Sequence, residues 1–166
     1  CIVAFAKYLG VIDNATKFKA IDGFHNAKIM ADVVYLQMQN VSKVETYEKH
    51  SFLDTGSPHH VEMVSSLDTF NVKTIGSQIR HGILYNETGS NVNFVEQVSE
   101  DMFAVRTYER GVEDETLSCG TGVTAVALAM HKTGKTESKA VYLKTEGGQL
   151  QVTFNTNEQR YNYTLY

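Results

Sequence analysis

The chain has 166 residues, 42% of them hydrophobic, which is enough apolar material for one packed domain or two small ones. Its formal net charge is −4 and it has no block of Lys or Arg, so we expect neither a nucleic-acid nor a membrane-surface partner. No apolar run approaches the roughly 20 residues of a membrane span, and no signal peptide leads the chain, whereas its two cysteines, expected to be free thiols, predict a cytoplasmic protein.

Residues 1–50 predict one helix followed by three strands. The apolar segment Cys1–Leu9 predicts a helix that ends at Gly10. A turn is expected at Gly23–Asn26, and the polar, mixed segment Asn40–His50 is the expected crossing between two domains. The three strands are expected at Lys17–Asp22, Ala27–Asp32 and Val33–Gln39.

The remainder of the chain predicts many strands and two helices. One helix is expected at Thr74–Ile83. The other contains the alanine-rich run Val123–Met130, has Cys119 at its N-terminus and stops at Gly134. The run has no polar stripe, so we expect this helix to be buried on all sides. The strands are expected at Phe52–Thr55, His60–Val64, Val92–Val98, Met102–Tyr108, Lys139–Thr145, Gln149–Asn155 and Tyr161–Tyr166.

The two parts of the chain repeat each other. When Gly10 is aligned with Gly134, two small apolar helices coincide, and Lys19–Ile21 matches Lys139–Val141. Each half is then a helix followed by a strand, a turn and a strand. In this register the counterpart of Cys119 falls before the first residue of the chain.

The ends and the cysteines fit a piece of a longer protein. The chain begins at Cys1 without Met, inside an apolar run, and ends at Tyr166 inside an alternating pattern, whereas natural termini usually carry a polar fringe. Two cysteines are too few for a disulfide framework, and we expect both to be free thiols in a reducing compartment. The sequence leaves the oligomeric state open, with a homodimer among the alternatives.

Cys119 is the first candidate for chemistry. At the start of a buried helix, free backbone N–H groups and the positive end of the dipole face the thiol, and we expect them to lower its pKa. Gly120 and Gly122 allow the backbone to approach a small anionic ligand, and Glu109 and Arg110 supply an acid/base group and a carboxylate-binding fork. The alternative is an inert, buried cysteine of the core.

Three stretches resemble the diaminopimelate epimerase family of cofactor-independent amino-acid epimerases. They are Asp54-Thr55-Gly56-Ser57-Pro58-His59, Asn91-Val92-Asn93-Phe94-Val95 and the run from Tyr108 to Ala125, in the family's order. The resemblance covers about residues 52 to 154. Proline racemase and the phenazine-type isomerases share the fold, but Glu109-Arg110-Gly111 is more similar to the epimerases.

The resemblance implies an α+β fold in which an antiparallel, barrel-like sheet wraps around a buried central helix, repeated in two domains. By this comparison residues 1–44 are the end of the first domain, 45–156 are the second domain, and 157–166 return to the sheet of the first. Cys1 then matches a non-catalytic cysteine of the family, and the first catalytic cysteine has no counterpart.

The resemblance also implies the activity. The family interconverts L,L- and meso-diaminopimelate, for lysine and peptidoglycan precursors, with a thiol and a thiolate on opposite faces of the α-carbon. Cys119 matches one of the pair, and His59 and Glu109 match the residues that assist it. No cofactor is expected, no scattered His pairs into a metal site, and the 166 residues alone are expected to be inactive as an epimerase.

The residues implied to bind the substrate are Arg110, Asn91, Gly120, Thr121 and Ser57. Taken alone, His59 could be a surface or capping residue, Asn91 a turn residue, and Arg110 the partner of Glu113 or Asp114 in a surface ion pair. The family often has Asn where this chain has Ser57, which keeps a hydrogen-bonding group but has a shorter reach.

A second departure lies at Val112–Glu115, which is one residue longer and more acidic than the usual run. Two other functions stay open. One is an isomerase of the same fold that acts on proline or hydroxyproline. The other is a non-catalytic binding fragment, for which the missing first cysteine is the main argument.

Overall fold

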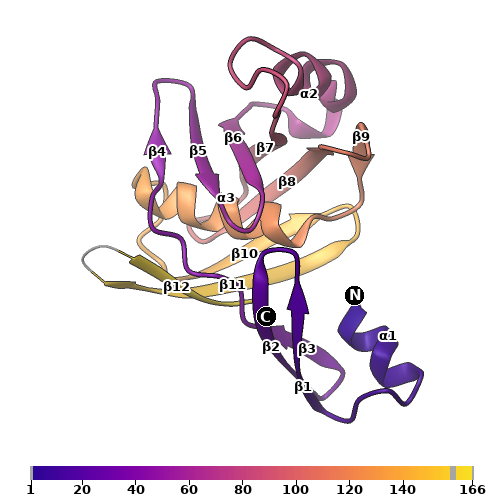
Figure 1. The fold of residues 1–166 in the computed structure, drawn as a ribbon. Helices are drawn as coiled ribbons and strands as arrows, with labels where there is room; N and C mark the ends of the chain where they lie inside the picture. Colours follow the sequence, from indigo (N-terminus) through magenta and orange to yellow (C-terminus); the bar gives the residue numbers. More distant parts are fainter. Residues whose placement is uncertain (1, 158–159, 166) are drawn as a thin grey trace.

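A computed structural model describes residues 2–157 and 160–165 (Figure 1). The helices are α1 (Ile2–Tyr8), the 3₁₀ helix η1 (Leu67–Thr69), α2 (Val72–Arg80) and α3 (Gly120–Lys132). The strands are β1 (Ala15–Ala20), β2 (Gly23–Met30), β3 (Val33–Leu36), β4 (Glu45–Thr46), β5 (His50–Asp54), β6 (Pro58–Met63), β7 (Asn91–Gln97), β8 (Met102–Glu109), β9 (Asp114–Thr116), β10 (Ala140–Thr145), β11 (Gly148–Asn157) and β12 (Arg160–Leu165).

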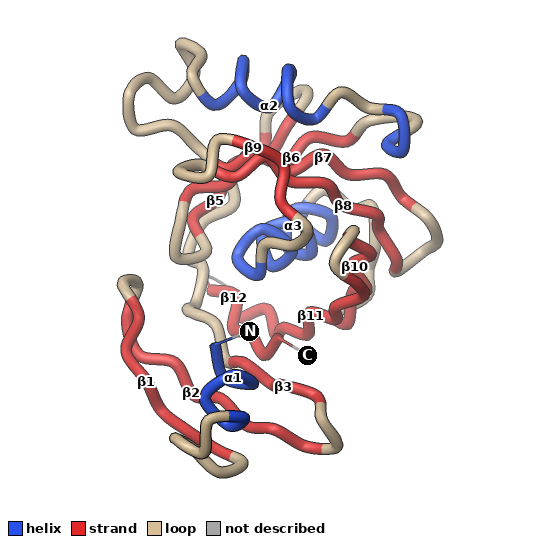
Figure 2. The backbone as a smooth tube through the Cα atoms, turned by 90° about the vertical axis from the view of Figure 1, so that its right-hand side faces the viewer, coloured by secondary structure: helices blue, strands red, loops and turns tan. Residues whose placement is uncertain are grey.

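All described strands belong to one curled sheet. Its order is β1-β2-β3-β12-β11-β10-β8-β7-β6-β5-β4, with β9 added beside β8. Figure 2 shows the strands from β5 to β12 arranged around α3, which lies inside the ring. The predicted α+β fold, a barrel-like sheet around a central helix, is confirmed. The sheet is mixed rather than purely antiparallel, because β6 pairs with β7 and β8 with β10 in parallel.

The helix α3 is the centre of the main core. All its residues from Gly122 to Met130 are buried, and it contacts β5, β6, β7, β8, β10 and β11. A helix without a polar stripe can bury its whole circumference only inside such a sheet. It ends at Lys132 with Thr133 as its C-cap, and Gly134 follows with a φ of +69°, as the sequence predicts.

A smaller unit precedes this barrel. Its helix α1 packs Val3 against Ala27 and Ile29 of β2, whereas Phe5 and Tyr8 of the same helix are exposed. The order of helix, strand, turn and strand repeats in α3, β10 and β11, as the internal alignment predicts, and a third antiparallel strand follows in both parts, β3 in the first and β12 in the second. Cys1 lies outside the described residues.

The predicted turn at Gly23–Asn26 is wrong. Ala20 pairs with Gly23, so the turn consists of Ile21 and Asp22, and residues 23–26 belong to β2. The physical reason is that β2 alternates from Gly23 onward, with His25 on the same buried face as Ala27. A buried histidine in an apolar row is hard to distinguish from a polar turn residue in sequence.

The helix α2 lies outside the barrel, against β7 and β8. It begins two residues before the predicted Thr74, because the Asn71 side chain accepts a hydrogen bond from the Thr74 amide at 3.1 Å and caps the helix. It packs closely: a Cβ on Gly76 would lie 2.5 Å from the Cβ of Tyr108.

The strand β12 lies between β3 and β11 and so joins the first three strands to the rest of the sheet. It forms a hairpin with β11, and Leu165 pairs with Leu36 of β3. The division into domains at residues 44 and 156 stays a prediction. Residues 158, 159 and 166, which fall in the last of the three predicted segments, lie outside the described residues.

Candidate active site

Cys119 stands at the N-cap of α3, in an extended conformation with a φ of −123°. Its side chain is 8% exposed, and its Sγ atom lies 3.4 Å from the hydroxyl Oγ1 of Thr121. The strand β9 leads into this position, and the Gly147 amide donates to the Leu117 carbonyl at 2.7 Å, which fixes the connection. The thiol is therefore held at the helix start, as the sequence predicts, beside a polar neighbour.

The expected lowering of the Cys119 pKa is wrong for this structure. Burial raises the pKa of the thiol, and the negative charge of Glu109 raises it further. The Thr121 hydroxyl and the amides of Thr121 and Gly122 act in the opposite direction without outweighing burial. The resting group is therefore a thiol, because the stabilisation of an anion at a helix start is smaller than the cost of removing the anion from water.

His59 lies on β6 and is completely buried, so the alternative of a surface histidine is wrong. Its ring lies between Ser57, with Oγ 3.0 Å from Nε2, and Asn93, with Nδ2 3.1 Å from Nδ1. Burial, and then the positive charge of Arg110, lower the pKa of His59 to about 3. The imidazole is therefore neutral at physiological pH.

Asn91 is brought to His59 by the parallel pairing of β6 and β7, in which these two residues are partners. Its Nδ2 atom donates to Ser57 Oγ at 3.1 Å and to the Pro58 carbonyl at 3.0 Å. Its Oδ1 atom accepts from the backbone amide of Arg110 at 2.9 Å. Asn91 thus connects the start of β6 with the end of β8, which a turn residue does not do.

Glu109 is the last residue of β8, and Arg110 follows it directly. The charge of Glu109 acts on the Cys119 sulfur and that of Arg110 on His59. Arg110 donates from Nη1 to the Thr88 carbonyl at 3.0 Å. In the described part of the chain no carboxylate pairs with it, so the predicted alternative of a surface ion pair is wrong.

The two acidic residues proposed as partners of Arg110 bind elsewhere. Glu113 pairs with Arg80 at 3.1 Å, and Asp114 pairs with Lys73 at 2.6 Å. Glu113, in the longer run noted above, has a φ of +59°, a left-handed conformation in which glycine is the usual choice. Its carboxylate accepts from the Gly111 amide at 3.0 Å, which helps to hold this turn.

The first turn of α3 provides open space beside the thiol. A Cβ built on Gly120 meets no heavy atom within 4 Å, so its surroundings are free for a ligand. Thr55 donates its hydroxyl to the Thr121 carbonyl at 2.9 Å, which ties the turn of the first motif to the helix. Gly122 is different, because a Cβ there would lie 2.5 Å from Asn93 Oδ1 and 3.3 Å from the Cys119 sulfur.

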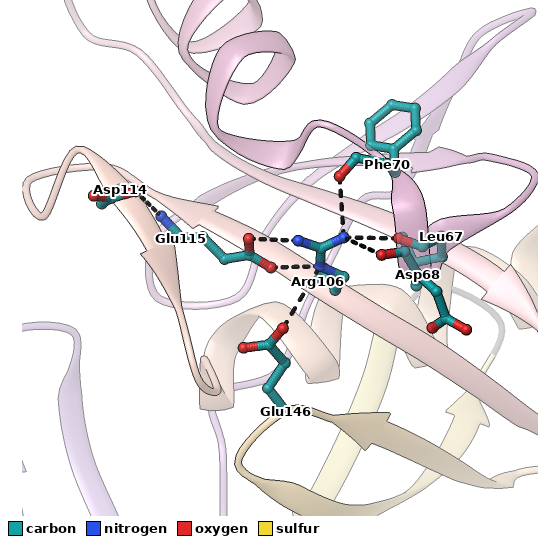
Figure 3. A network of polar contacts seen from close by, with 7 residues as sticks. All are labelled: Leu67, Asp68, Phe70, Arg106, Asp114, Glu115 and Glu146. Carbon is teal, nitrogen blue, oxygen red and sulfur yellow. Dashed lines mark hydrogen bonds and ion pairs between the residues drawn. The ribbon is translucent and has the colours of Figure 1, made fainter.

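Arg106 anchors the segment that leads to the site (Figure 3). Its guanidinium binds both carboxylate oxygens of Glu115 on β9, at 2.6 and 2.7 Å. Its Nη1 atom donates to the carbonyls of Leu67 and Phe70 at 2.8 and 3.0 Å. This arginine thus joins β8, β9 and η1, and it keeps the chain from Glu109 to Cys119 in place.

Sequence reasoning missed three residues that build the site: Arg106, Asn93 and Thr107. Asn93 and Thr107 are buried polar residues of β7 and β8, joined at 3.0 Å. Asn93 belongs to a quoted motif, and a buried amide on a central strand needs partners, which is the signal that was available. His60, expected to begin its strand, is the third residue of β6 and is buried between Tyr85 and Glu62.

The described residues contain no group of three or more His, Cys, Asp or Glu side chains that could hold a metal ion. Among the described helices, none combines the length and apolarity that crossing a bilayer requires.

The family model and the curated relatives agree on one family. The family model described as diaminopimelate epimerase matches residues 51–165. The chain is 54% identical over 156 residues to the diaminopimelate epimerase of Flavobacterium psychrophilum, covering 93% of this chain and 61% of that protein. It is 38% identical over 160 residues to that of Aquifex aeolicus, covering 90% of this chain and 57% of that protein. The chain therefore spans about three fifths of the length of these relatives.

Solved structures show the same fold at low identity. A hydroxyproline epimerase from Agrobacterium vitis, with bound trans-4-hydroxy-L-proline, matches with a TM-score of 0.74 and 15% identity over 99% of this chain and 60% of that chain. A phenazine biosynthesis protein of the PhzF family from Bacillus anthracis matches with a TM-score of 0.73 and 8% identity over 98% of this chain and 69% of that chain. At such identities the likeness concerns the fold alone.

Proposed function

This chain belongs to the diaminopimelate epimerase family, and from that premise we propose that its protein interconverts L,L- and meso-diaminopimelate. This isomerase activity would serve lysine and peptidoglycan precursor synthesis. The proposal is supported by the identity of 54% to a protein of that name and by the match of residues 51–165. The observation that carries it is that all three quoted motifs converge on one buried thiol at the start of α3.

We propose that Cys119 transfers the α-proton on one face of the substrate carbon. In one direction its thiol donates a proton to the carbanion that forms when a thiolate on the other face removes the α-proton. In the reverse direction Cys119 acts as the thiolate, and Glu109, whose charge acts on the sulfur, takes up its proton. Because Cys119 is the only cysteine among the described residues, the 166-residue chain alone is proposed to be inactive.

Arg110 and the first turn of α3 are proposed to bind the substrate. Within the described part of the chain the guanidinium bonds to the Thr88 carbonyl alone, which leaves donors for a ligand, and planar paired donors suit a carboxylate. The amides of Gly120 and Thr121 are proposed to hold the carboxylate at the reacting carbon. Asn91 and Ser57 complete the proposed set, although both already hold other site residues through their hydrogen bonds.

Exchange of the α-proton with solvent tests the activity directly. The full-length protein is incubated with L,L-diaminopimelate in deuterated water, and we expect deuterium at one α-carbon together with the meso product. Absence of deuterium in diaminopimelate would rule the proposal out. Proline and hydroxyproline in the same assay test the other isomerase activity, and no feature of the site favours them.

Cytoplasmic location and assembly as a homodimer are further proposals. The first rests on the free thiol and on the biosynthetic role. Light scattering on the purified full-length protein measures the mass in solution, and a monomer mass contradicts the dimer.

A further inference from the structure

The hydrogen bonds around His59 have one consistent direction, which starts at Asn93. The Nδ2 atom of Asn93 lies 2.8 Å from the carbonyl of His60, and a carbonyl only accepts, so the amide orientation is fixed. Its Oδ1 atom accepts from the Thr107 hydroxyl at 3.0 Å. The second hydrogen on Nδ2 then points to His59 Nδ1 at 3.1 Å. Asn93 and His59 are fully buried, so no water competes for these bonds.

The direction of the next bond follows from the imidazole. If Nδ1 of His59 accepts from Asn93, a neutral ring carries its proton on Nε2. This Nε2–H group faces Ser57 Oγ at 3.0 Å and donates to it. Ser57 therefore receives a hydrogen bond from the ring and does not give one.

Ser57 Oγ accepts two hydrogen bonds, so its own hydrogen must be donated to a third atom. The second donor is Asn91 Nδ2 at 3.1 Å, whose orientation is fixed by its bonds to the Pro58 carbonyl and the Arg110 amide. The Ser57 hydroxyl hydrogen is left for Thr121 Oγ1 at 3.4 Å. The Thr121 hydroxyl, which now accepts from Ser57, directs its own hydrogen to its second partner among the described residues.

That atom is the Cys119 sulfur, 3.4 Å from Thr121 Oγ1. We propose that Asn93 is a positioning residue that sets the direction of a hydrogen-bond relay through His59, Ser57 and Thr121, so that the relay ends as a donor to the sulfur. This inference rests on the proposed role of Cys119 as the reacting thiol. A donor aimed at sulfur stabilises the thiolate, which is the form that burial and Glu109 disfavour.

The relay depends on a serine at position 57. A hydroxyl oxygen accepts two hydrogen bonds and donates one, all at the same atom. An amide accepts at its oxygen and donates from its nitrogen, so it cannot do both at one atom. The charged groups that act on the relay are Glu109, on the sulfur, and Arg110, on the imidazole. Both stay in place in the variants proposed below.

The alkylation of Cys119 tests the end of the relay. The rate is measured on the full-length protein against pH with iodoacetamide, and mass spectrometry assigns the modified residue. Thr121→Val removes the hydroxyl with little change of volume, and we expect alkylation of Cys119 near pH 7 to slow by about tenfold. Thr121→Ser keeps the hydroxyl and should keep the wild-type rate. An unchanged rate in Thr121→Val, or an equal loss in Thr121→Ser, overturns the relay.

The tautomer of His59 tests its beginning. Nitrogen-15 spectra of the wild-type imidazole should show an unprotonated Nδ1 and a protonated Nε2, and the opposite tautomer overturns the proposal. In Asn93→Asp the carboxylate can only accept, so the proton should move to Nδ1 and alkylation of Cys119 should slow. If this variant does not fold, the wild-type spectrum alone decides.

Neither measurement needs turnover. A protein that exchanges no α-proton but shows the expected tautomer and alkylation rates would contradict the proposed function and leave the relay intact. A protein that epimerises diaminopimelate but carries the His59 proton on Nδ1 would support the proposed function and contradict the relay.

Discussion

His59 shows how a single residue makes the stability of this fold depend on pH. Burial, and then Arg110, lower its pKa to about 3, whereas a histidine in an unfolded chain titrates near 6.5. Between these values the unfolded state binds a proton at this position and the folded state does not. The free energy of unfolding therefore falls as the pH falls from about 6.5 toward 3, by at most about 1.4 kcal/mol per pH unit from this group.

We accordingly expect His59→Gln to flatten this dependence. The variant keeps a side-chain amide near the Nε2 position but cannot be protonated, so its free energy of unfolding should change less between pH 7 and pH 5 than that of the wild type. Urea unfolding at both values measures the difference. An equal change in the free energy of unfolding between the two pH values in both proteins would contradict a neutral, buried imidazole.

The thiol offers a second test at this scale. The charge of Glu109 contributes to the raised pKa of Cys119, so Glu109→Gln should lower that pKa and speed alkylation of the sulfur near neutral pH. Glu100 lies on an exposed part of the surface, and Glu100→Gln is the matched control that removes the same charge elsewhere. If Cys119 in Glu109→Gln is alkylated at the same rate as in Glu100→Gln, the charge of Glu109 does not act on the sulfur.

At the scale of elements, the contact between α3 and β7 decides the shape of the site. Gly122 on the helix faces the Oδ1 atom of Asn93 on the strand, with no room for a methyl group at this point. The strand residue in turn is fixed by Thr107 of β8. A glycine at the third residue of α3 is therefore a requirement of packing, whereas Gly120, the first residue, faces open space.

Gly122→Ala should destabilise the fold by about 1 to 3 kcal/mol, since the amide of Asn93 or the start of α3 must shift. Gly120→Ala serves as the matched control and should leave the free energy of unfolding within about 0.5 kcal/mol. Thermal unfolding of both variants measures the contrast. Equal effects would show that the close approach does not constrain the helix.

The anchoring of β9 by Arg106 gives another prediction for the elements. Arg106→Lys keeps the charge but loses the paired bonds to Glu115 and most of the bonds to the η1 carbonyls. We therefore expect the free energy of unfolding to fall by about 1 to 3 kcal/mol. Glu146 lies 3.9 Å from the guanidinium and is half exposed, and Glu146→Gln should cost less than about 0.5 kcal/mol. Denaturant unfolding of both variants compares them.

At the scale of the whole molecule, local patterns predicted most elements. The run after Cys119 and the hairpins β7–β8 and β10–β11 were predictable because their periodicity and turns lie within short stretches. The parallel pairing of β6 with β7 was not, because it joins segments more than 30 residues apart and depends on packing against α3. The motifs indicated which residues meet, but the burial that raises the Cys119 pKa appears only in three dimensions.

The described chain presents one thiol to the site, which gives a prediction for the whole molecule. We expect the isolated 166-residue polypeptide to incorporate no deuterium into diaminopimelate, because its described residues supply one thiol and the proposed mechanism needs two. The full-length protein under the same conditions is the control. Exchange by the isolated polypeptide would show that one thiol suffices.

The parallel pairing of His59 with Asn91 has a consequence for how the molecule folds. Contacts between distant segments form slowly, because the intervening loop must lose its freedom first. Refolding from urea should therefore restore helical circular dichroism before the sulfur becomes shielded from a thiol reagent. The moment at which Cys119 escapes labelling would then mark the completion of the native state.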